Sequence, residues 1–179
     1  MARPASDDEL IGRAREGDQR AFQEIVERYE GKVAATVIGM MGPGPEADDV
    51  GQETFIRFYG SLDRFRGESG LATYLTRIAI NQSLKTLKKR RSLKDRFFRL
   101  DDDDAYFEEP TADVDERAEL VRDAVLHLKP ELRAVVVLRM FQGYSTRETA
   151  EQLGLPEGTV MSRLARALEK LERRLEQLL

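Results

Sequence analysis

The sequence predicts an all-α protein: two small helical domains joined by an acidic, flexible linker. Apolar residues recur at three- and four-residue steps along most of the chain, and Val, Ile and Thr nowhere build a sustained period-two alternation. Residues 101–116 (DDDDAYFEEPTADVDE) are rich in acids and poor in apolar side chains, so burial cannot offset the entropy of ordering them. A chain of 179 residues can bury one modest core or two small ones, and this connector favours two.

The first domain is expected over residues 1–92, as three helices. Ser6 and Glu9 have the spacing of a capping box, in which the serine oxygen accepts a hydrogen bond one turn into the helix and the glutamate reaches back, so a helix should begin there. Three helices with helical-period apolar faces form one compact bundle. Glycine and proline interrupt the pattern near Gly17-Asp18, at Gly42-Pro43-Gly44-Pro45 and at Gly67-Glu68-Ser69-Gly70.

Charge is distributed unevenly along the chain. The total is −4, but residues 93–118 hold 4 Lys and Arg against 10 Asp and Glu, a net −6, whereas the block on either side carries +1. We expect the linker over residues 93–117 and a second helical domain over residues 118–179. Because phosphate contact depends on Lys and Arg, any affinity for DNA must come from local basic faces, and the protein alone should bind DNA weakly.

Composition argues against most enzyme classes. The chain has no cysteine and a single histidine, His127, which removes zinc fingers, iron–sulfur clusters and most Ser/His or Cys/His catalysis. A metal-dependent hydrolase built on Asp101 to Asp104 is the enzyme alternative, but consecutive acids in a flexible run hold no ligand geometry. We expect no catalytic residue, metal or cofactor. Without a long apolar run or an apolar leader, we also expect no membrane insertion and a cytoplasmic location.

The segment from Thr146 to Ala165 has the spacing of a helix-turn-helix. Ser145 and Glu148 form a second capping box, Gly154 suits a tight turn, and Pro156 suits the start of the next helix. The buried stripe of that helix leaves a few polar side chains outside it as candidates for contact with a DNA groove. The alternative is an ordinary helical hairpin with solvated arginines. The candidate groove readers are Ser162, Arg163 and Arg166.

A second basic face lies on the third helix of the first domain. Its residues are four, four and three positions apart, so they share one side of the helix and suit a nucleic-acid backbone. Asn81 adds a donor and an acceptor for a base edge, and Phe65 and Tyr74 are candidates for stacking on unpaired bases. The alternatives are a solvated helix end and two core aromatic residues. The face consists of Arg77, Asn81, Lys85 and Lys88.

Several stretches resemble the extracytoplasmic-function (ECF) group of the sigma-70 family of RNA polymerase sigma factors. Residues 48–55 (DDVGQETF), 62–69 (LDRFRGES) and 73–81 (TYLTRIAIN) are similar to the sigma-2 domain of that group. Residues 128–175, with GTVMSRL at 158–164, are similar to its sigma-4 domain. The two matches stand in the family's order and are separated by a linker of family-like length.

The resemblance implies a promoter-specificity subunit, with RNA polymerase core and promoter DNA as partners. Its sigma-2 domain would dock on the clamp helices of the largest polymerase subunit and help to open the −10 element, while the flap of the second-largest subunit holds sigma-4. An anti-sigma factor that covers both polymerase-binding faces is also expected. The implied residues are Asp49, Gln52, Glu53, Phe55, Arg57 and Tyr59 for polymerase; Phe65, Tyr74, Arg77, Asn81, Lys85 and Lys88 for the −10 strand; and Thr159, Ser162, Arg163 and Arg166 for the −35 element.

The sequence departs from the family's pattern at a few positions. The family usually has tryptophan where Tyr74 stands, a basic residue where Met161 stands, and a basic or aromatic residue near Ala165. Gly51 is unusual inside a polymerase-contacting helix, where it costs about 1 kcal/mol against alanine.

Two non-enzymatic alternatives remain. A stand-alone helix-turn-helix regulator would bind duplex DNA tightly without polymerase. A sigma mimic would sequester an anti-sigma factor and never touch a promoter; such a protein has less reason to keep Arg77, Asn81 and Lys85 on one face.

Overall fold

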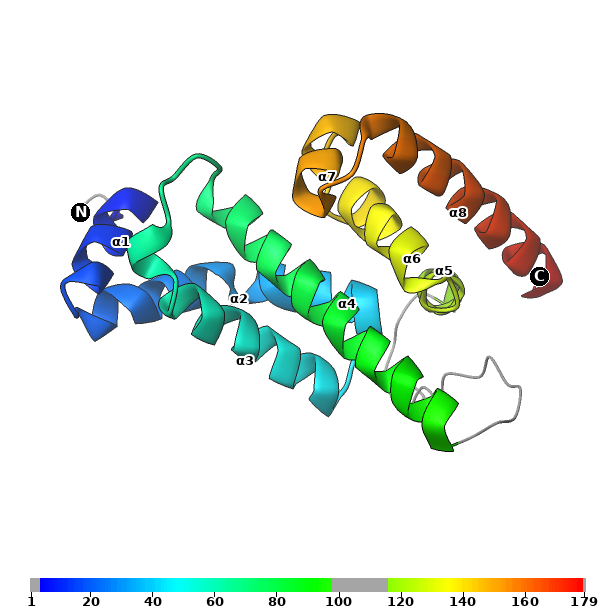
Figure 1. The fold of residues 1–179 in the computed structure, drawn as a ribbon, viewed down its shortest axis with the longest axis horizontal. Coiled ribbons are helices and arrows are strands. Elements are labelled where there is room, and N and C mark those ends of the chain that lie inside the picture. Colours follow the sequence, from blue (N-terminus) through cyan, green and yellow to red (C-terminus); the bar gives the residue numbers. More distant parts are fainter. Residues whose placement is uncertain (1–3, 98–115, 179) are drawn as a thin grey trace.

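The computed structural model describes residues 4–97 and 116–178, and every regular element within them is helical. The chain folds into two helical blocks that lie side by side (Figure 1). The predicted all-α class with two helical units is confirmed. The first block contains α1 (Asp7–Arg15), α2 (Gln19–Met41), α3 (Pro45–Tyr59), the 3₁₀ turn η1 (Leu62–Arg64) and α4 (Leu71–Phe97); the second contains α5 (Glu116–Leu126), α6 (Pro130–Val136), the π-helical turn η2 (Val137–Phe141), α7 (Thr146–Leu153) and α8 (Glu157–Leu178).

The helix boundaries follow the local signals in the sequence. At the start of α1, the Ser6 side chain accepts from the Glu9 N–H at 3.3 Å, and the Ser6 N–H donates to the Glu9 carboxylate at 2.7 Å. The predicted interruption after α1 contains Gly17 at φ 91°, a conformation that glycine adopts without strain. Asp18 then caps α2 by accepting from the backbone N–H groups of its first turn. The capping box and the break are therefore confirmed, and because the break separates α1 from α2, the described part of the first block has four α-helices where three were expected.

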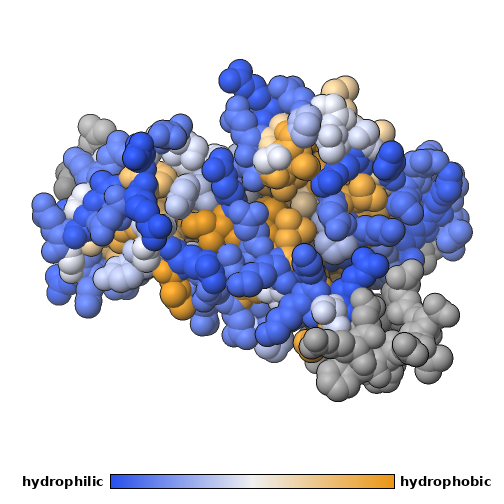
Figure 2. All heavy atoms as spheres, in the orientation of Figure 1, coloured by the Kyte–Doolittle hydropathy of each residue, from blue (hydrophilic) through white to orange (hydrophobic). Residues whose placement is uncertain are grey.

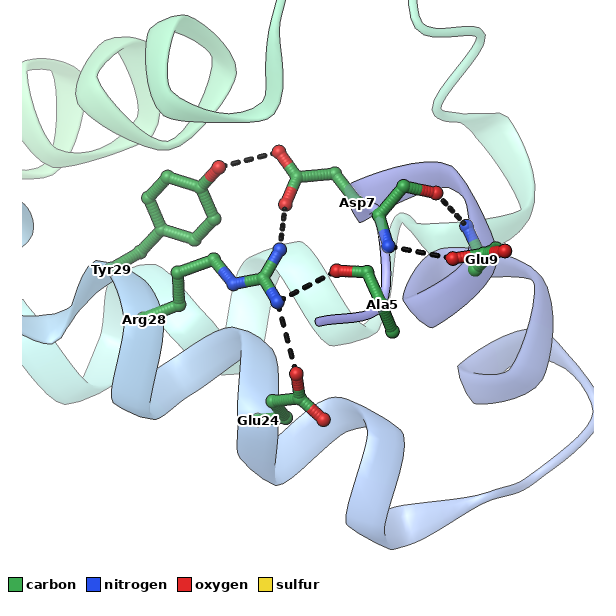
Figure 3. Close-up of polar contacts among 7 residues, drawn as sticks. Ala5, Asp7, Glu9, Glu24, Arg28 and Tyr29 are labelled. Carbon is green, nitrogen blue, oxygen red and sulfur yellow. Dashed lines mark hydrogen bonds and ion pairs between the residues drawn. The ribbon is translucent and has the colours of Figure 1, made fainter. Parts of the chain in front are cut away.

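A polar network anchors α1 to α2 (Figure 3). Asp7 accepts from the Tyr29 hydroxyl at 2.5 Å and from Arg28 at 2.8 Å. Arg28 also donates to the Ala5 carbonyl and to Glu24. Burial, together with the hydrogen bond to Asp7, raises the pKa of Tyr29 to about 12. The network fixes the N-terminal helix on the rest of the first block.

The acidic segment lies mostly outside the described residues. Helix α4 continues to Phe97, past the expected domain boundary at residue 92, and α5 begins at Glu116. The predictions for residues 98–115, including the rejected ligand set Asp101 to Asp104, fall on residues that the structure does not describe.

The largest hydrophobic cluster spans both blocks, so the expectation of two separate cores is wrong; the second block also contains two smaller clusters of its own. Ala134, Val137, Leu138 and Tyr144 of the second block are buried in the same cluster as the core residues of α1 to α4. The backbones approach closely at Gly39, where an added Cβ would lie 3.1 Å from a Val137 methyl carbon. We call this contact the seam. It joins Lys32, Gly39, Met40 and Thr76 to Arg133, Val137 and Tyr144.

Polar contacts also cross the seam. The buried Arg133 guanidinium donates to the Met40 carbonyl at the end of α2. The Tyr144 hydroxyl donates to the Thr76 hydroxyl at 3.3 Å, and the Lys32 ammonium lies 5.3 Å from the centre of the Tyr144 ring. Figure 2 shows apolar atoms gathered along the middle of the molecule, where the blocks meet, with hydrophilic surface on either side. The blocks are therefore held together by both burial and hydrogen bonds.

No helix in residues 4–97 or 116–178 combines the length and apolar character needed to cross a membrane. In the same residues, no three His, Cys, Asp or Glu side chains are grouped as metal ligands.

Candidate nucleic-acid interface

Helices α7 and α8 form the predicted helix-turn-helix. The Ser145 side chain accepts from the Glu148 N–H at 3.2 Å, and the Ser145 N–H donates to the Glu148 carboxylate at 2.7 Å. Hydrogen bonds from the Ser145 side chain and from its backbone N–H to the carboxylate lower the pKa of Glu148. Gly154 ends α7 at φ 64° and ψ 38°, the left-handed conformation that the tight turn needs. Ala150 and Val160 pack together between the two helices. The capping box and the turn are confirmed.

The predicted −35 residues lie along the first turns of α8, and we call Thr159, Ser162, Arg163 and Arg166 the α8 face. Ser162 and Arg166 are exposed, whereas Thr159 and Arg163 are half-buried at its edge. The Ser162 hydroxyl donates to the Thr159 carbonyl at 3.1 Å. Its proton is therefore used within the helix, and its oxygen remains as an acceptor.

The arginines of α8 divide into two pairs. Arg173 pairs with Glu169 at 2.5 Å, and Arg174 pairs with Asp123 at 3.2 Å. Arg163 and Arg166 have no carboxylate partner among the described residues, although α8 carries glutamates further along. The two cations nearest the turn are thus available to an external anion.

The predicted −10 residues on α4 share one side of the helix, and we call Arg77, Asn81, Lys85 and Lys88 the α4 face. Asn81, Lys85 and Lys88 are exposed. Arg77 is half-buried, and its Nε is buried without a hydrogen-bond partner in the described part of the chain. Further along, Arg90 pairs with Glu46 at 2.8 Å. The α4 face, like the α8 face, contains cations without a described carboxylate partner.

The two aromatic residues proposed for base stacking lie in the core of the first block. Phe65 is 7% exposed, and its ring centre lies 4.9 Å from that of the half-buried Tyr74. Both rings also contact Phe58 edge-on, with centroids 6.0 Å apart. The Tyr74 hydroxyl donates to the Ser61 hydroxyl at 3.3 Å. In this conformation the rings pack against each other, so stacking on a base stays a prediction that requires them to be uncovered.

Arg15, which the sequence did not single out, braces the segment that leads to α4. Its Nε donates to the Leu62 carbonyl at 2.9 Å, and an Nη donates to the Phe65 carbonyl. These bonds link α1 to η1 across 47 and 50 positions of sequence. A lone arginine at a helix end gives no sequence signal for such a contact.

The predicted polymerase-docking residues lie on α3. We call Asp49, Gln52, Glu53, Phe55, Arg57 and Tyr59 the α3 face. Arg57 pairs with Glu53 at 2.7 Å, and Phe55 is half-buried against the core. Sequence reasoning missed Ile56, which is 64% exposed, beside Tyr59 at 53%. Ile56 lies outside the buried stripe of Val50, Thr54 and Phe58. An apolar residue outside the buried stripe of a helix is the sequence signal that could have identified it.

Comparison with known proteins identifies both blocks. The family described as "Sigma-70 region 2" matches residues 25–93, and "Sigma-70, region 4" matches residues 118–171. The chain is 35% identical to the RNA polymerase sigma-H factor of Pseudomonas aeruginosa, with 100% of this chain and 98% of that protein covered. It is 33% identical to the ECF RNA polymerase sigma-E factor of Haemophilus influenzae, with 100% of both covered.

A solved structure agrees with the fold. The structure of CnrH in complex with the cytosolic domain of CnrY aligns with a TM-score of 0.65 and 30% identity, over 94% of this chain and 96% of that one. The family resemblance predicted from the sequence is confirmed. With both sigma-70 regions present in order and relatives that match from end to end, the chain belongs to the ECF group of RNA polymerase sigma factors, the promoter-specificity subunits of bacterial RNA polymerase.

Proposed function

We propose that this sigma factor uses three surfaces during initiation. The α8 face binds duplex DNA at the −35 element, the α4 face holds the melted strand of the −10 element, and the α3 face docks on the clamp helices of the polymerase core. Residues 1–92 and 118–179 act as the two reading domains, and residues 93–117 connect them. The flap of the core holds the second domain from the side opposite its DNA-binding face.

The observation that carries the proposal is the distribution of unpaired cations. Arg173 and Arg174 of α8 have carboxylate partners, whereas Arg163 and Arg166, next to the helix-turn-helix turn, have none among the described residues. Unpaired arginines can form bidentate bonds with guanine edges or phosphates without first breaking an ion pair. Both arginines lie near the start of the second helix, and in helix-turn-helix motifs this part of the second helix enters the major groove.

Two weak DNA contacts, at the −35 and −10 elements, become selective when both are attached to one polymerase core. The core supplies nonspecific affinity, and binding at one element raises the effective concentration of the other reading surface at its own element. Joint binding is strong only where the two elements have the right spacing. The role needs positioned contacts and no reacting side chain, so we propose that the protein is not an enzyme and that it acts in the cytoplasm.

The −35 assignment is tested by transcription in vitro with core polymerase from the native host. Start sites are first mapped on a genomic library, and single variants are then compared on one promoter. Arg166→Ala should lower initiation about 5- to 150-fold, the range expected when an arginine that reads a base is lost. The matched control is Arg173→Ala, which removes an exposed ion pair on the same helix and should change initiation by less than about twofold.

The outcomes separate the candidate functions. Equal effects of the two variants would refute the −35 role of α8. If the protein binds core but no start site depends on it, the mimic that sequesters an anti-sigma factor gains support. If it binds duplex DNA tightly without core, the stand-alone regulator is the better description.

Core docking is tested at α3. Ile56→Glu places a charge on the most exposed large apolar residue of the described chain, and contact with a partner would then bury an unpaired carboxylate. Affinity for core should fall at least about tenfold. Ala34→Glu, an exposed position on α2, is the control. Equal affinities for the two variants would remove α3 from the docking surface.

We also propose control by an anti-sigma factor. The supporting observation is that CnrH, 30% identical to this chain, was solved with the cytosolic domain of CnrY bound. Affinity capture of the tagged protein from its uninduced native host should recover a partner besides polymerase that competes with core for binding. Recovery of polymerase alone would contradict this part of the proposal.

A further inference from the structure

The exposed side of α8 near its N-terminus contains a strip in which apolar and polar side chains lie in two parallel rows. Gly158, Ser162 and Arg166 follow one another at four-residue steps, and Met161 and Ala165 form a parallel row beside them. All five are exposed. Met161 is 63% exposed, although Val160 next to it is fully buried against α7. A large apolar side chain is thus held in water on the side of the helix that the proposed function turns toward DNA.

The polar side chains on this strip can read few bases. Between residues 158 and 166 there is no Asn, Gln, Asp or Glu, the residue types that pair with adenine or cytosine edges in the major groove. Ser162 donates its proton to the Thr159 carbonyl, and Arg166 is the exposed charged donor of this strip. Apart from the Ser162 oxygen, which can still accept from a base amino group, hydrogen bonding therefore specifies little more than guanine or phosphate at this surface.

The remaining chemical signal in the major groove is the thymine methyl group, which small and apolar side chains contact. Each A·T pair presents one such methyl, on one strand or the other. Met161 is unbranched and polarisable, so it adapts to an irregular apolar surface. Gly158 has open space around its missing Cβ, and Ala165 is small, so neither holds the helix away from the groove floor.

We infer that Met161 and Ala165 are specificity-determining residues that read thymine methyl groups in the −35 duplex. This inference rests on the proposed role of α8 and adds the class of base that it selects. DNA is favoured over a protein as the occupant of the strip because the unpaired Arg163 and Arg166 lie beside it, and two cations without described carboxylates suit a polyanion.

The inference is tested by deleting single methyl groups from the DNA. Promoter fragments carry deoxyuridine in place of one thymine at a time on both strands of the −35 region, and holoenzyme affinity is measured by competition at fixed salt. For the wild-type protein, at least one replacement should weaken binding about fourfold, the effect of withdrawing one buried methyl-sized group. Replacement of thymines outside both elements is the control on the DNA.

The matching protein variants complete a cycle. Met161→Ala should weaken binding to the thymine fragment and make binding indifferent to deoxyuridine at the same position. Leu168→Ala, an apolar residue 44% exposed further along α8, should retain the wild-type sensitivity. Insensitivity of the wild type to every replacement, or undiminished sensitivity in Met161→Ala, would overturn the inference.

Failure of the proposed function looks different. In that case neither Arg166→Ala nor a change in the −35 sequence alters the affinity of the holoenzyme for the promoter, whether the fragment contains thymine or deoxyuridine. If Met161→Ala leaves DNA binding unchanged but weakens binding to a captured protein partner, the strip is a protein-docking surface and the methyl-reading inference is wrong.

Discussion

Replacing Arg133 by methionine should destabilise the protein through the backbone carbonyls that its guanidinium holds. The side chain is 7% exposed, and it donates to the carbonyls of Met40, Leu126 and Leu128. Burial lowers its pKa from 12.5 to about 10, so the group stays charged at neutral pH. That shift corresponds to a cost of roughly 3 kcal/mol for keeping the charge in the folded protein.

The hydrogen bonds outweigh this cost. A bond to a charged donor contributes about 2 kcal/mol, so the three bonds together exceed the burial cost by about 3 kcal/mol. Methionine removes the charge and the bonds together and leaves the carbonyls without their donor. The free energy of unfolding should fall by about 3 kcal/mol, which lowers the melting temperature by about 6–12 °C for a chain of this size.

Urea denaturation followed by circular dichroism measures the change. The control is Arg147→Met, since the Arg147 side chain is 79% exposed and its carboxylate partner among the described residues is its helix neighbour Glu151; its loss should cost less than about 0.5 kcal/mol. Arg133→Lys keeps a charge but cannot reach all three carbonyls, so its loss of unfolding free energy should lie between those of Arg133→Met and Arg147→Met. If Arg133→Met costs no more than Arg147→Met, the reasoning about the buried guanidinium is wrong.

Three further predictions concern other contacts. Arg15→Gln weakens the brace on η1 and should lower initiation on duplex promoters about tenfold, the loss of one charge-assisted bond, while premelted templates are spared; equal losses on both would indicate general damage. Ser145→Ala removes the side-chain half of the capping box of α7 and should cost about 1 kcal/mol in urea unfolding. Because the bond from the Ser145 side chain is the largest cause that lowers the pKa of Glu148, that difference should be present above pH 4.5 and shrink as the pH falls through the folded-state pKa; a constant difference down to acid pH would contradict it. Tyr29 should ionise near pH 12 in an absorbance titration, and Asp7→Asn should lower that value; because the pKa is raised, the stabilising contribution is complete below pH 10 and is lost as the pH rises toward 12. An unchanged midpoint in Asp7→Asn would exclude Asp7 as a cause.

Much of the fold could be predicted because its signals are local. Capping boxes at Ser6 and Ser145 and the left-handed turn at Gly154 depend on residues within one helical turn of each other, so the sequence contains the whole interaction. The α4 and α8 faces follow from spacing alone, since residues three or four apart share a side of a helix. Domain identity was predictable from the quoted family motifs.

Contacts between distant segments were not predictable in the same way. The donors of Arg15 meet carbonyls that no short pattern links to them, and the stacking candidates Phe65 and Tyr74 proved to lie in an aromatic cluster. One usable signal was overlooked. Residues 134–138 form an unbroken apolar run, and a helix that is apolar all round must be covered on every side. In the structure Val135 faces α7 and α8, while Val137 faces the first block.

The seam also has a consequence for synthesis of the chain. The Met40 carbonyl and Arg133 are 93 positions apart, so the first block leaves the ribosome well before the partner that covers it. At 5–20 residues per second, the side of α2 around Gly39 and Met40 waits roughly 5 to 20 seconds for residues 133–144. During that interval the nascent protein presents an apolar surface that the finished chain buries, and chaperones act on such a surface while translation continues.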